Sequence, residues 1–187
     1  MPRGGPVRSQ KSASDGIVLA VDNPRGVAVA GALRLALGRL QPHVGSIARP
    51  NAAFGPLGEA LFWLCSLDQL LIDVHGSSYE DVRDKDPDGR LVPGLRFARN
   101  RVAHGVEVAS VSEINPENAV LGLGILGQMR LGTPANLTWS RFDAIPLPPP
   151  KLRRPAQEAS YQEHLAGKAV FETVEDGVQW LRSTAGV

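Results

Sequence analysis

The chain has 187 residues and a formal net charge of +1, with 43% hydrophobic and 21% charged side chains. A chain of this length buries a sizeable core without disulfides or metals, and this composition is ordinary for a globular protein. The near-neutral charge excludes nucleic-acid binding through bulk positive charge, so any contact with RNA or DNA depends on a local basic patch.

The N-terminal part of the chain combines a polar tail with a first helix. Residues 1–15 mix Gly, Pro, Ser, Arg and Lys without periodicity, which predicts a disordered tail. A core domain is expected over residues 16–110, and it begins with a short apolar run at 17–21. Apolar residues then recur at helical spacing from Gly26 to Leu40, so we expect the first helix there.

A second, longer helix is predicted from about Asn51 to His75. Its apolar residues are spaced by three or four positions, which gives a sustained seam along one side of a helix: Leu57, Leu61, Leu64, Leu67, Leu71 and Val74. The single cysteine, Cys65, lies among apolar neighbours and is expected to be a buried structural thiol. The following segment, 81–93, is rich in Asp, Arg, Pro and Gly and is predicted to be a polar loop.

The second half of the chain is expected to be an appendage to the helical core. Residues 111–150 are predicted to form an irregular or β extension that ends in a Pro-rich linker, with one or two strands near 137–145. Residues 151–187 are predicted to form two short amphipathic helices, 156–166 and 171–181, that pack on the core. The fold class is therefore mainly α, with a small irregular or β segment and C-terminal helices.

Localisation is predicted from what the chain lacks. No stretch is long and apolar enough to span a bilayer, and the first residues lack the apolar centre of a signal peptide. We therefore expect a cytoplasmic protein with no membrane partner.

The third helix, expected from about residue 94 to 108, carries the best candidates for chemistry. At about 100° per residue its apolar residues form a core stripe, and an opposite side carries Arg96, Asn100 and His104. Asn100 and His104 are four residues apart and hence neighbours. Arg99 lies about 140° from His104 on the same wheel. A single copy therefore does not direct Arg99 and His104 at one point, whereas two copies about a two-fold axis would pair each Arg99 with the other copy's His104.

The segment Arg99-Asn100-Arg101-Val102-Ala103-His104 resembles the Arg-x4-His signature of the HEPN superfamily, in its Arg-Asn-x-x-x-His form. The resemblance covers about residues 25–108, where the signature lies on a late helix and a long helix precedes it across a polar loop. It implies a HEPN-like helical bundle. Many proteins of this superfamily are metal-independent endoribonucleases that act as homodimers, and a toxin or phage-defence role follows from the same resemblance.

The implied chemistry suits the residues present. RNA carries its own nucleophile, the 2′-hydroxyl, and a histidine can remove its proton or protonate the leaving 5′-oxygen. Arg99 would stabilise the extra negative charge on phosphorus, and Asn100 would orient His104 or bind phosphate. A dimer supplies two His104 side chains, one for the base and one for the acid. The partners implied are RNA, a second copy of the chain, and an antitoxin or regulatory protein.

Three further residues are assigned around this motif. Asp68 lies on the side of the second helix expected to face the third, where its carboxylate would hold His104 or Arg99 in place. It is about as plausible that Asp68 is an exposed acid or the partner of a structural arginine. Arg96 and Arg101 flank the candidate site and would hold RNA phosphates, unless they are ordinary solvated arginines.

Competing interpretations use other parts of the sequence. A non-catalytic helical module would dimerise and bind RNA or a protein partner through the same face. The segment Gly122–Gly127 spells G-x-G-x-x-G, but Pro134 cuts short any following helix, so a nucleotide site is not favoured. The other histidines do not have metal-ligand spacing, so neither a metal nor a cofactor is expected.

Overall fold

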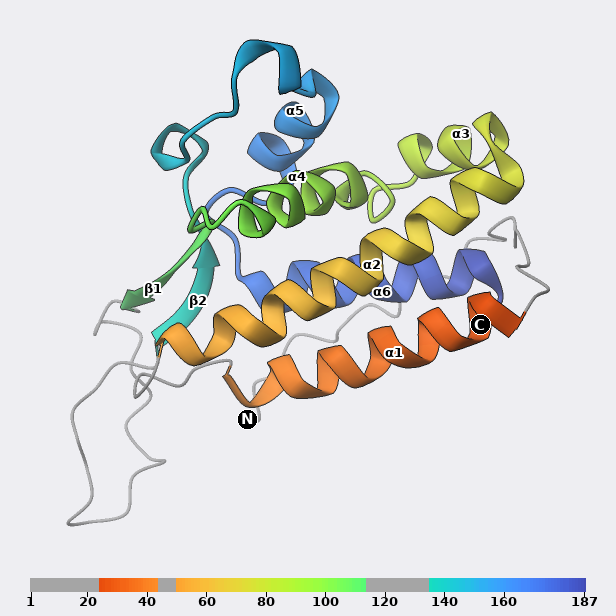
Figure 1. Cartoon of the computed structure of the whole chain (residues 1–187), viewed down its shortest axis with the longest axis horizontal. Coiled ribbons are helices and arrows are strands. Elements are labelled where there is room, and N and C mark those ends of the chain that lie inside the picture. The colour runs from red at the N-terminus through yellow and green to blue at the C-terminus, as the bar shows by residue number, and fades with distance from the viewer. Residues whose placement is uncertain (1–23, 44–49, 114–134) are drawn as a thin grey trace, which may run out of the picture.

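The computed structural model describes residues 24–43, 50–113 and 135–187. These residues form six α-helices, a two-stranded antiparallel sheet and several short 3₁₀ turns (Figure 1). The bounds are α1 Pro24–Leu40, α2 Phe54–His75, α3 Ser77–Lys85, α4 Leu91–Ala103, β1 Ala109–Glu113, β2 Ala135–Trp139, α5 Pro155–His164 and α6 Val170–Ala185. The expectation of a mainly helical protein with a small β segment is confirmed. The tail at 1–15, the apolar run at 17–21 and the glycine motif at 122–127 lie outside the described residues.

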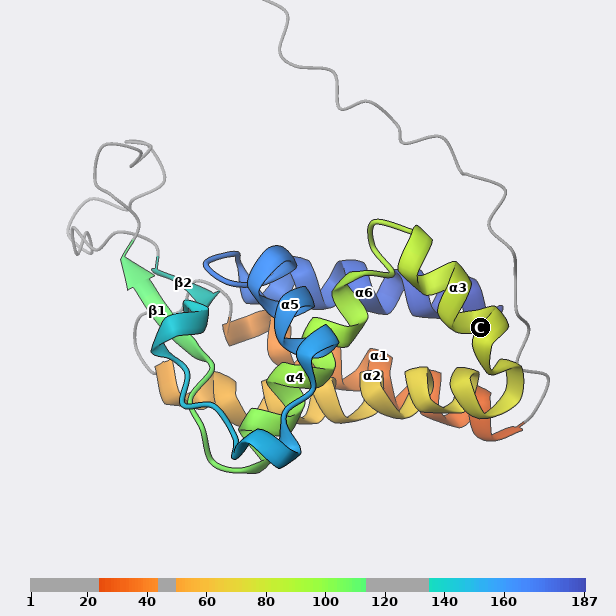
Figure 2. The same ribbon diagram turned by 90° about the horizontal axis from the view of Figure 1, so that it is seen from above.

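The helices are stacked with α2 at the centre. α2 packs against α1 on one side and α4 on the other, and α6 packs against α1, α2 and α4. α5 lies across the outer side of α4 (Figures 1 and 2). The antiparallel pair β1–β2, with Ala109 opposite Trp139, lies at one end of this stack. Helix α4 is therefore held between α2 and α5.

The leucine seam predicted for α2 forms the core of the molecule. Its leucines at 57, 61, 64, 67 and 71 are fully buried, because their spacing places them on the side that faces the other helices. Val74, the last residue of the predicted seam, is half exposed because α2 ends one residue later. The α-helix begins at Phe54 rather than Asn51, after a 3₁₀ turn over Pro50–Ala53.

The polar loop predicted from residue 81 is wrong for its first part, where α3 forms instead. α3 is short and strongly polar, and Tyr79 is its buried anchor. The Asp86 carboxylate accepts hydrogen bonds from the backbone N–H groups of Asp88 and Gly89, and this turn leads into α4. A helix with one buried residue gives almost no apolar periodicity, which is why the sequence pattern missed it.

Helix α4 is also shorter than predicted, because it ends at Ala103 instead of about residue 108. The Gly105 N–H donates to Val102 O, and the Val106 N–H donates to Arg101 O. This is the hydrogen-bond pattern of a Schellman motif, and Gly105 adopts the left-handed conformation that it requires, with φ +70°. His104 is thus the residue at which the helix stops.

No helix within the described ranges has the length and apolar character needed to cross a membrane. The partly buried and fully buried side chains of all six helices and both strands contribute to one continuous core.

Candidate functional site

The side chain of His104 lies exposed at the C-terminal end of α4. The Schellman motif fixes its backbone, since the His104 N–H donates to Arg101 O at 3.0 Å and Gly105 turns the chain away immediately afterwards. Within the described residues, the imidazole makes no hydrogen bond or ion pair with another side chain. A fixed backbone with a free imidazole is suitable for proton transfer to a bound molecule.

Arg99 and Asn100 are half-buried and are joined to each other. The Arg99 Nη1 donates to Asn100 Oδ1 at 3.1 Å, and the Asn100 Nδ2 donates to Gln157 Oε1 of α5 at 3.4 Å. The Arg99 guanidinium also lies 5.9 Å from the centre of the Phe62 ring on α2. Asn100 therefore connects α4 to α5, while Arg99 lies over α2.

These contacts show how the motif residues are distributed around α4. Arg99 lies on the side of α2, Asn100 lies on the side of α5, and His104 is one turn beyond Asn100. No hydrogen bond in the described part of the chain joins His104 to Arg99 or Asn100. The structure therefore joins Arg99 and Asn100 by a hydrogen bond, and in the described residues it joins the imidazole to neither of them.

Asp68 is the centre of a buried polar cluster between α2, α3 and α4. Its carboxylate is completely buried and accepts a hydrogen bond from the Tyr79 hydroxyl at 2.6 Å. Arg96 pairs with the other oxygen, Oδ2, and the Arg83 Nη1 lies 3.8 Å from Oδ1, the oxygen that accepts from Tyr79. The expected contact of Asp68 with His104 or Arg99 is not formed. The acid instead binds two structural arginines, one on α3 and one on α4.

Of the two arginines expected to hold phosphate, Arg96 is half-buried and paired, and Arg101 is buried. Arg96 is occupied by Asp68 and by Gln69, whose Oε1 accepts from its Nη1 at 3.0 Å. Arg101 is only 8% exposed, on the same helical face as Gly94, which lies directly against α5. Arg101 Nε is buried and finds no hydrogen-bond partner in the described residues. Arg99 differs from both: it is half-buried, and it has no acidic partner among the described residues.

Burial changes the pKa values of two groups near this cluster. It raises the pKa of the Cys65 thiol to about 12, so the cysteine is inert as a nucleophile at neutral pH. Burial, together with the charge and hydrogen bond of Asp68, also raises the pKa of Tyr79 far above its ordinary value. Both groups stay neutral, which suits a structural role beside the charged Asp68–Arg96 pair.

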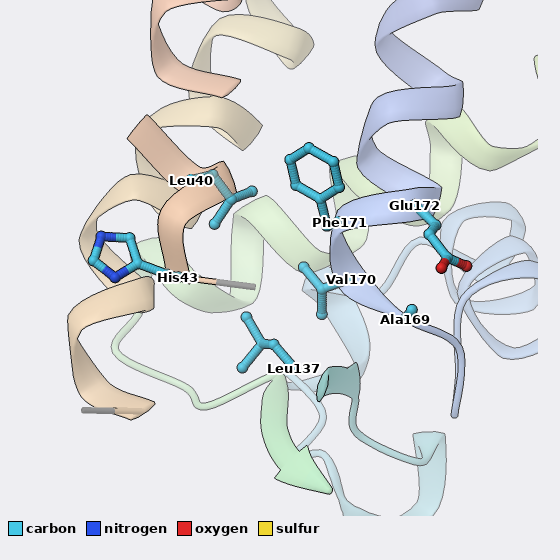
Figure 3. Close-up of a pocket in the computed structure, with 7 residues that line it drawn as sticks. All are labelled: Leu40, His43, Leu137, Ala169, Val170, Phe171 and Glu172. Atoms are coloured by element: carbon cyan, nitrogen blue, oxygen red, sulfur yellow. The ribbon is translucent and has the colours of Figure 1, made fainter. Parts of the chain in front are cut away.

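The cavities elsewhere do not contain the motif residues. Figure 3 shows the residues that line one cavity, among them Leu40, His43, Leu137 and the start of α6. The volume of this cavity is about 30 Å³. It has room for water but not for a nucleotide. Two grooves of about 580 and 570 Å³ lie beside α6, and neither is lined by Arg99, Asn100 or His104. Among the described residues, no group of three or more His, Cys, Asp or Glu side chains could hold a metal ion.

Sequence reasoning missed three residues that shape this region. Gln157 and Phe62 contact the motif from α5 and α2, and only the packing of these helices reveals their positions. Gly105 was readable in advance, since a glycine directly after a histidine at a helix end is a typical Schellman signal.

No protein-family model matches the chain, and neither a curated protein nor a solved structure matches it. Family and function are therefore inferred from the residues of α4 and their contacts.

Proposed function

We propose that the protein is a metal-independent endoribonuclease of HEPN type that acts as a homodimer. The observation that carries this proposal is that the side chains of His104 and Arg99 are both accessible and have no acidic partner within the described residues. His104 is exposed and Arg99 is half-buried, whereas half-buried Arg96 is paired with Asp68 and Arg101 is only 8% exposed. The imidazole and the guanidinium that the Arg-Asn-x-x-x-His pattern assigns to chemistry are thus the groups left for a substrate.

Each of these side chains has a role in transesterification. His104 removes the proton from the 2′-hydroxyl, the 2′-oxygen attacks phosphorus, and the bond to the leaving 5′-oxygen breaks with proton transfer to that oxygen. Arg99 places a planar pair of N–H donors on the phosphoryl oxygens, where negative charge increases. The products are a 2′,3′-cyclic phosphate and a 5′-hydroxyl end. Asn100, fixed by Gln157, keeps Arg99 in place.

A second copy completes the proposed site. Because Arg99 lies toward α2 while His104 lies one turn beyond Asn100, we infer that one copy does not direct both groups at a single phosphate. A two-fold pair of α4 helices brings the Arg99 of one copy to the His104 of the other, and it supplies two imidazoles to one cleft. We assign the protein a cytoplasmic role as a toxin or phage-defence effector, with RNA as substrate and an antitoxin or regulatory protein as a further partner.

The direct test is cleavage of RNA by the purified protein in the presence of a chelator. His104→Ala should lower the cleavage rate by about 10²- to 10⁴-fold, and Arg99→Ala by about 10²- to 10³-fold. His164→Ala and Arg34→Ala, which change the same residue types on α5 and α1, are the matched controls and should keep wild-type rates. A requirement for added metal, or undiminished cleavage by His104→Ala, would contradict the proposal.

One observation favours a second candidate, a non-catalytic dimeric module that binds RNA or a protein partner through the same face. No side chain in the described ranges orients the His104 ring, whereas a catalytic imidazole is commonly held by a neighbour. This candidate keeps RNA or partner binding but predicts that wild-type protein and His104→Ala leave RNA intact alike. Expression also separates the two: a ribonuclease slows growth and His104→Ala relieves it.

A further inference from the structure

Phe62 is a large aromatic side chain that α2 leaves open to solvent beside the motif. Its side chain is 46% exposed, although α2 carries the leucine seam of the core. The residues four positions away on either side are small, namely Gly58 and Ser66, and the Ser66 hydroxyl donates to Phe62 O at 2.8 Å. These two residues therefore do not cover the ring.

The packing of α2 against α4 places this ring next to Arg99. The two helices run antiparallel, since Gly58 faces Val102, Phe62 faces Arg99, and Asp68 faces Arg96. The Arg99 guanidinium lies 5.9 Å from the ring centre, at the outer limit of a cation–π contact. Such a contact is weak, so replacing it with a base stacked on the ring costs little.

The remaining neighbours of Phe62 favour an anionic ligand with a flat apolar part. Glu59, one turn earlier on α2, is paired with Arg39 of α1, which neutralises its charge. Trp63 meets the Phe62 ring edge-on, with centroids 5.0 Å apart and planes at 78°, and so stiffens its position. A rigid exposed aromatic ring beside a phosphate-binding arginine is the combination that proteins use to hold an unpaired base and its phosphate.

We propose that Phe62 stacks on the base of a nucleotide next to the scissile phosphate, so that the substrate is single-stranded RNA. This inference rests on the proposed endoribonuclease function and deepens it. A base in a duplex is covered on both faces and cannot reach the ring, whereas an unstacked base in a loop or single strand can. Stacking is tolerant of sequence, so Phe62 would select strandedness rather than one particular base.

The test measures binding rather than cleavage. A short 2′-O-methyl oligonucleotide lacks the 2′-hydroxyl nucleophile and stays intact, and its affinity is measured by fluorescence anisotropy. An abasic oligomer of the same length and charge is the second probe. Phe62→Leu keeps apolar volume but removes the π face, and Phe62→Trp enlarges it. Val74→Ala, at another exposed apolar position of α2, is the control variant.

Stacking predicts that Phe62→Leu weakens binding of the base-bearing oligomer by about 5- to 100-fold and leaves binding of the abasic oligomer unchanged. Phe62→Trp should bind the base-bearing oligomer at least as tightly as the wild type, and Val74→Ala should behave as the wild type. Equal effects of Phe62→Leu on both oligomers, or no effect on either, would overturn the stacking role while leaving the nuclease proposal standing.

Two other outcomes have distinct meanings. If light scattering shows that Phe62→Leu turns a dimer into a monomer, Phe62 is a subunit contact and the stacking role is refuted. If the wild-type protein binds neither oligomer and cleaves no RNA, the endoribonuclease proposal fails, and the role of Phe62 fails with it.

Discussion

Replacing Asp68 with Asn should destabilise the protein strongly, because it removes the only carboxylate on which the buried cluster between α2, α3 and α4 depends in the described structure. The Asp68 side chain is 1% exposed and binds Tyr79, Arg96 and Arg83. The Asn amide keeps one acceptor but turns an N–H₂ group toward a donor. Arg96 loses its counter-charge, whereas Arg83 keeps Asp84, whose Oδ1 lies 3.0 Å from its Nε.

The size of this effect follows from the burial of the partners. Breaking a fully buried ion pair costs about 3–5 kcal/mol. Arg96 and Arg83 retain 23% and 13% side-chain exposure, so water recovers part of their solvation. We therefore expect a loss of about 3 kcal/mol in the free energy of unfolding, which for a chain of this size lowers Tm by about 6–12 °C.

Urea unfolding followed by tryptophan fluorescence is a suitable assay, because the Trp180 ring lies 5.9 Å from Tyr79. Asp73→Asn is the matched control, since Asp73 is an exposed acid of the same helix whose partner is the Gln69 amide at 2.8 Å. It should change the free energy of unfolding by less than about 0.5 kcal/mol. A loss below about 1 kcal/mol for Asp68→Asn, or equal losses for both variants, would refute the reasoning.

Three further predictions concern packing, reactivity and acid stability. Gly94→Ala should cost about 1–3 kcal/mol in thermal or urea unfolding, because the added Cβ would lie 2.9 Å from the Tyr161 backbone nitrogen; unchanged stability would contradict the close contact of α4 and α5. Since burial raises the pKa of Cys65 to about 12, iodoacetamide at pH 8 should label the unfolded protein but hardly the native one; rapid native labelling would oppose this. The hydrogen bond from Arg153 lowers the pKa of Glu158 below its ordinary 4.5, so its stabilisation is present above that pH and is lost as the pH falls through the lower folded-state value. The urea midpoint should therefore fall between pH 6 and pH 3, and Glu158→Gln should reduce this fall. An equal fall in Glu158→Gln would argue against a stabilising Arg153–Glu158 ion pair.

The sequence predicted the helices whose apolar residues recur regularly and missed the one that is held by a polar cluster. The leucines of α2 carry their own periodicity, so α2 was located closely. Helix α3 has a single buried anchor, Tyr79, and its other contacts are charged groups that meet only after folding. For the same reason, the pairing of Arg83 with Asp68 was invisible in the sequence.

The candidate site shows the same division. The positions of Arg99 and Asn100 on one helix followed from spacing alone, because a helical wheel needs no tertiary information. The helix was expected to continue past His104 and instead ends there. The burial of Arg101 and the capture of Arg96 by Asp68 did not, since both depend on which helices cover α4. From sequence alone, a basic residue on a helix is predicted to be exposed to solvent, because the helix that covers it is not known.

The most direct test of the composite site is inhibition of the wild-type protein by an inactive copy of itself. A double variant, Arg99→Ala with His104→Ala, is mixed with wild-type protein under conditions in which subunits exchange, and RNA cleavage is measured per wild-type chain. If each site needs groups from both copies, a roughly nine-fold excess of the variant lowers this activity to about one tenth, since random pairing leaves few wild-type homodimers. Unchanged activity per wild-type chain, with exchange verified, would contradict a site shared between two copies.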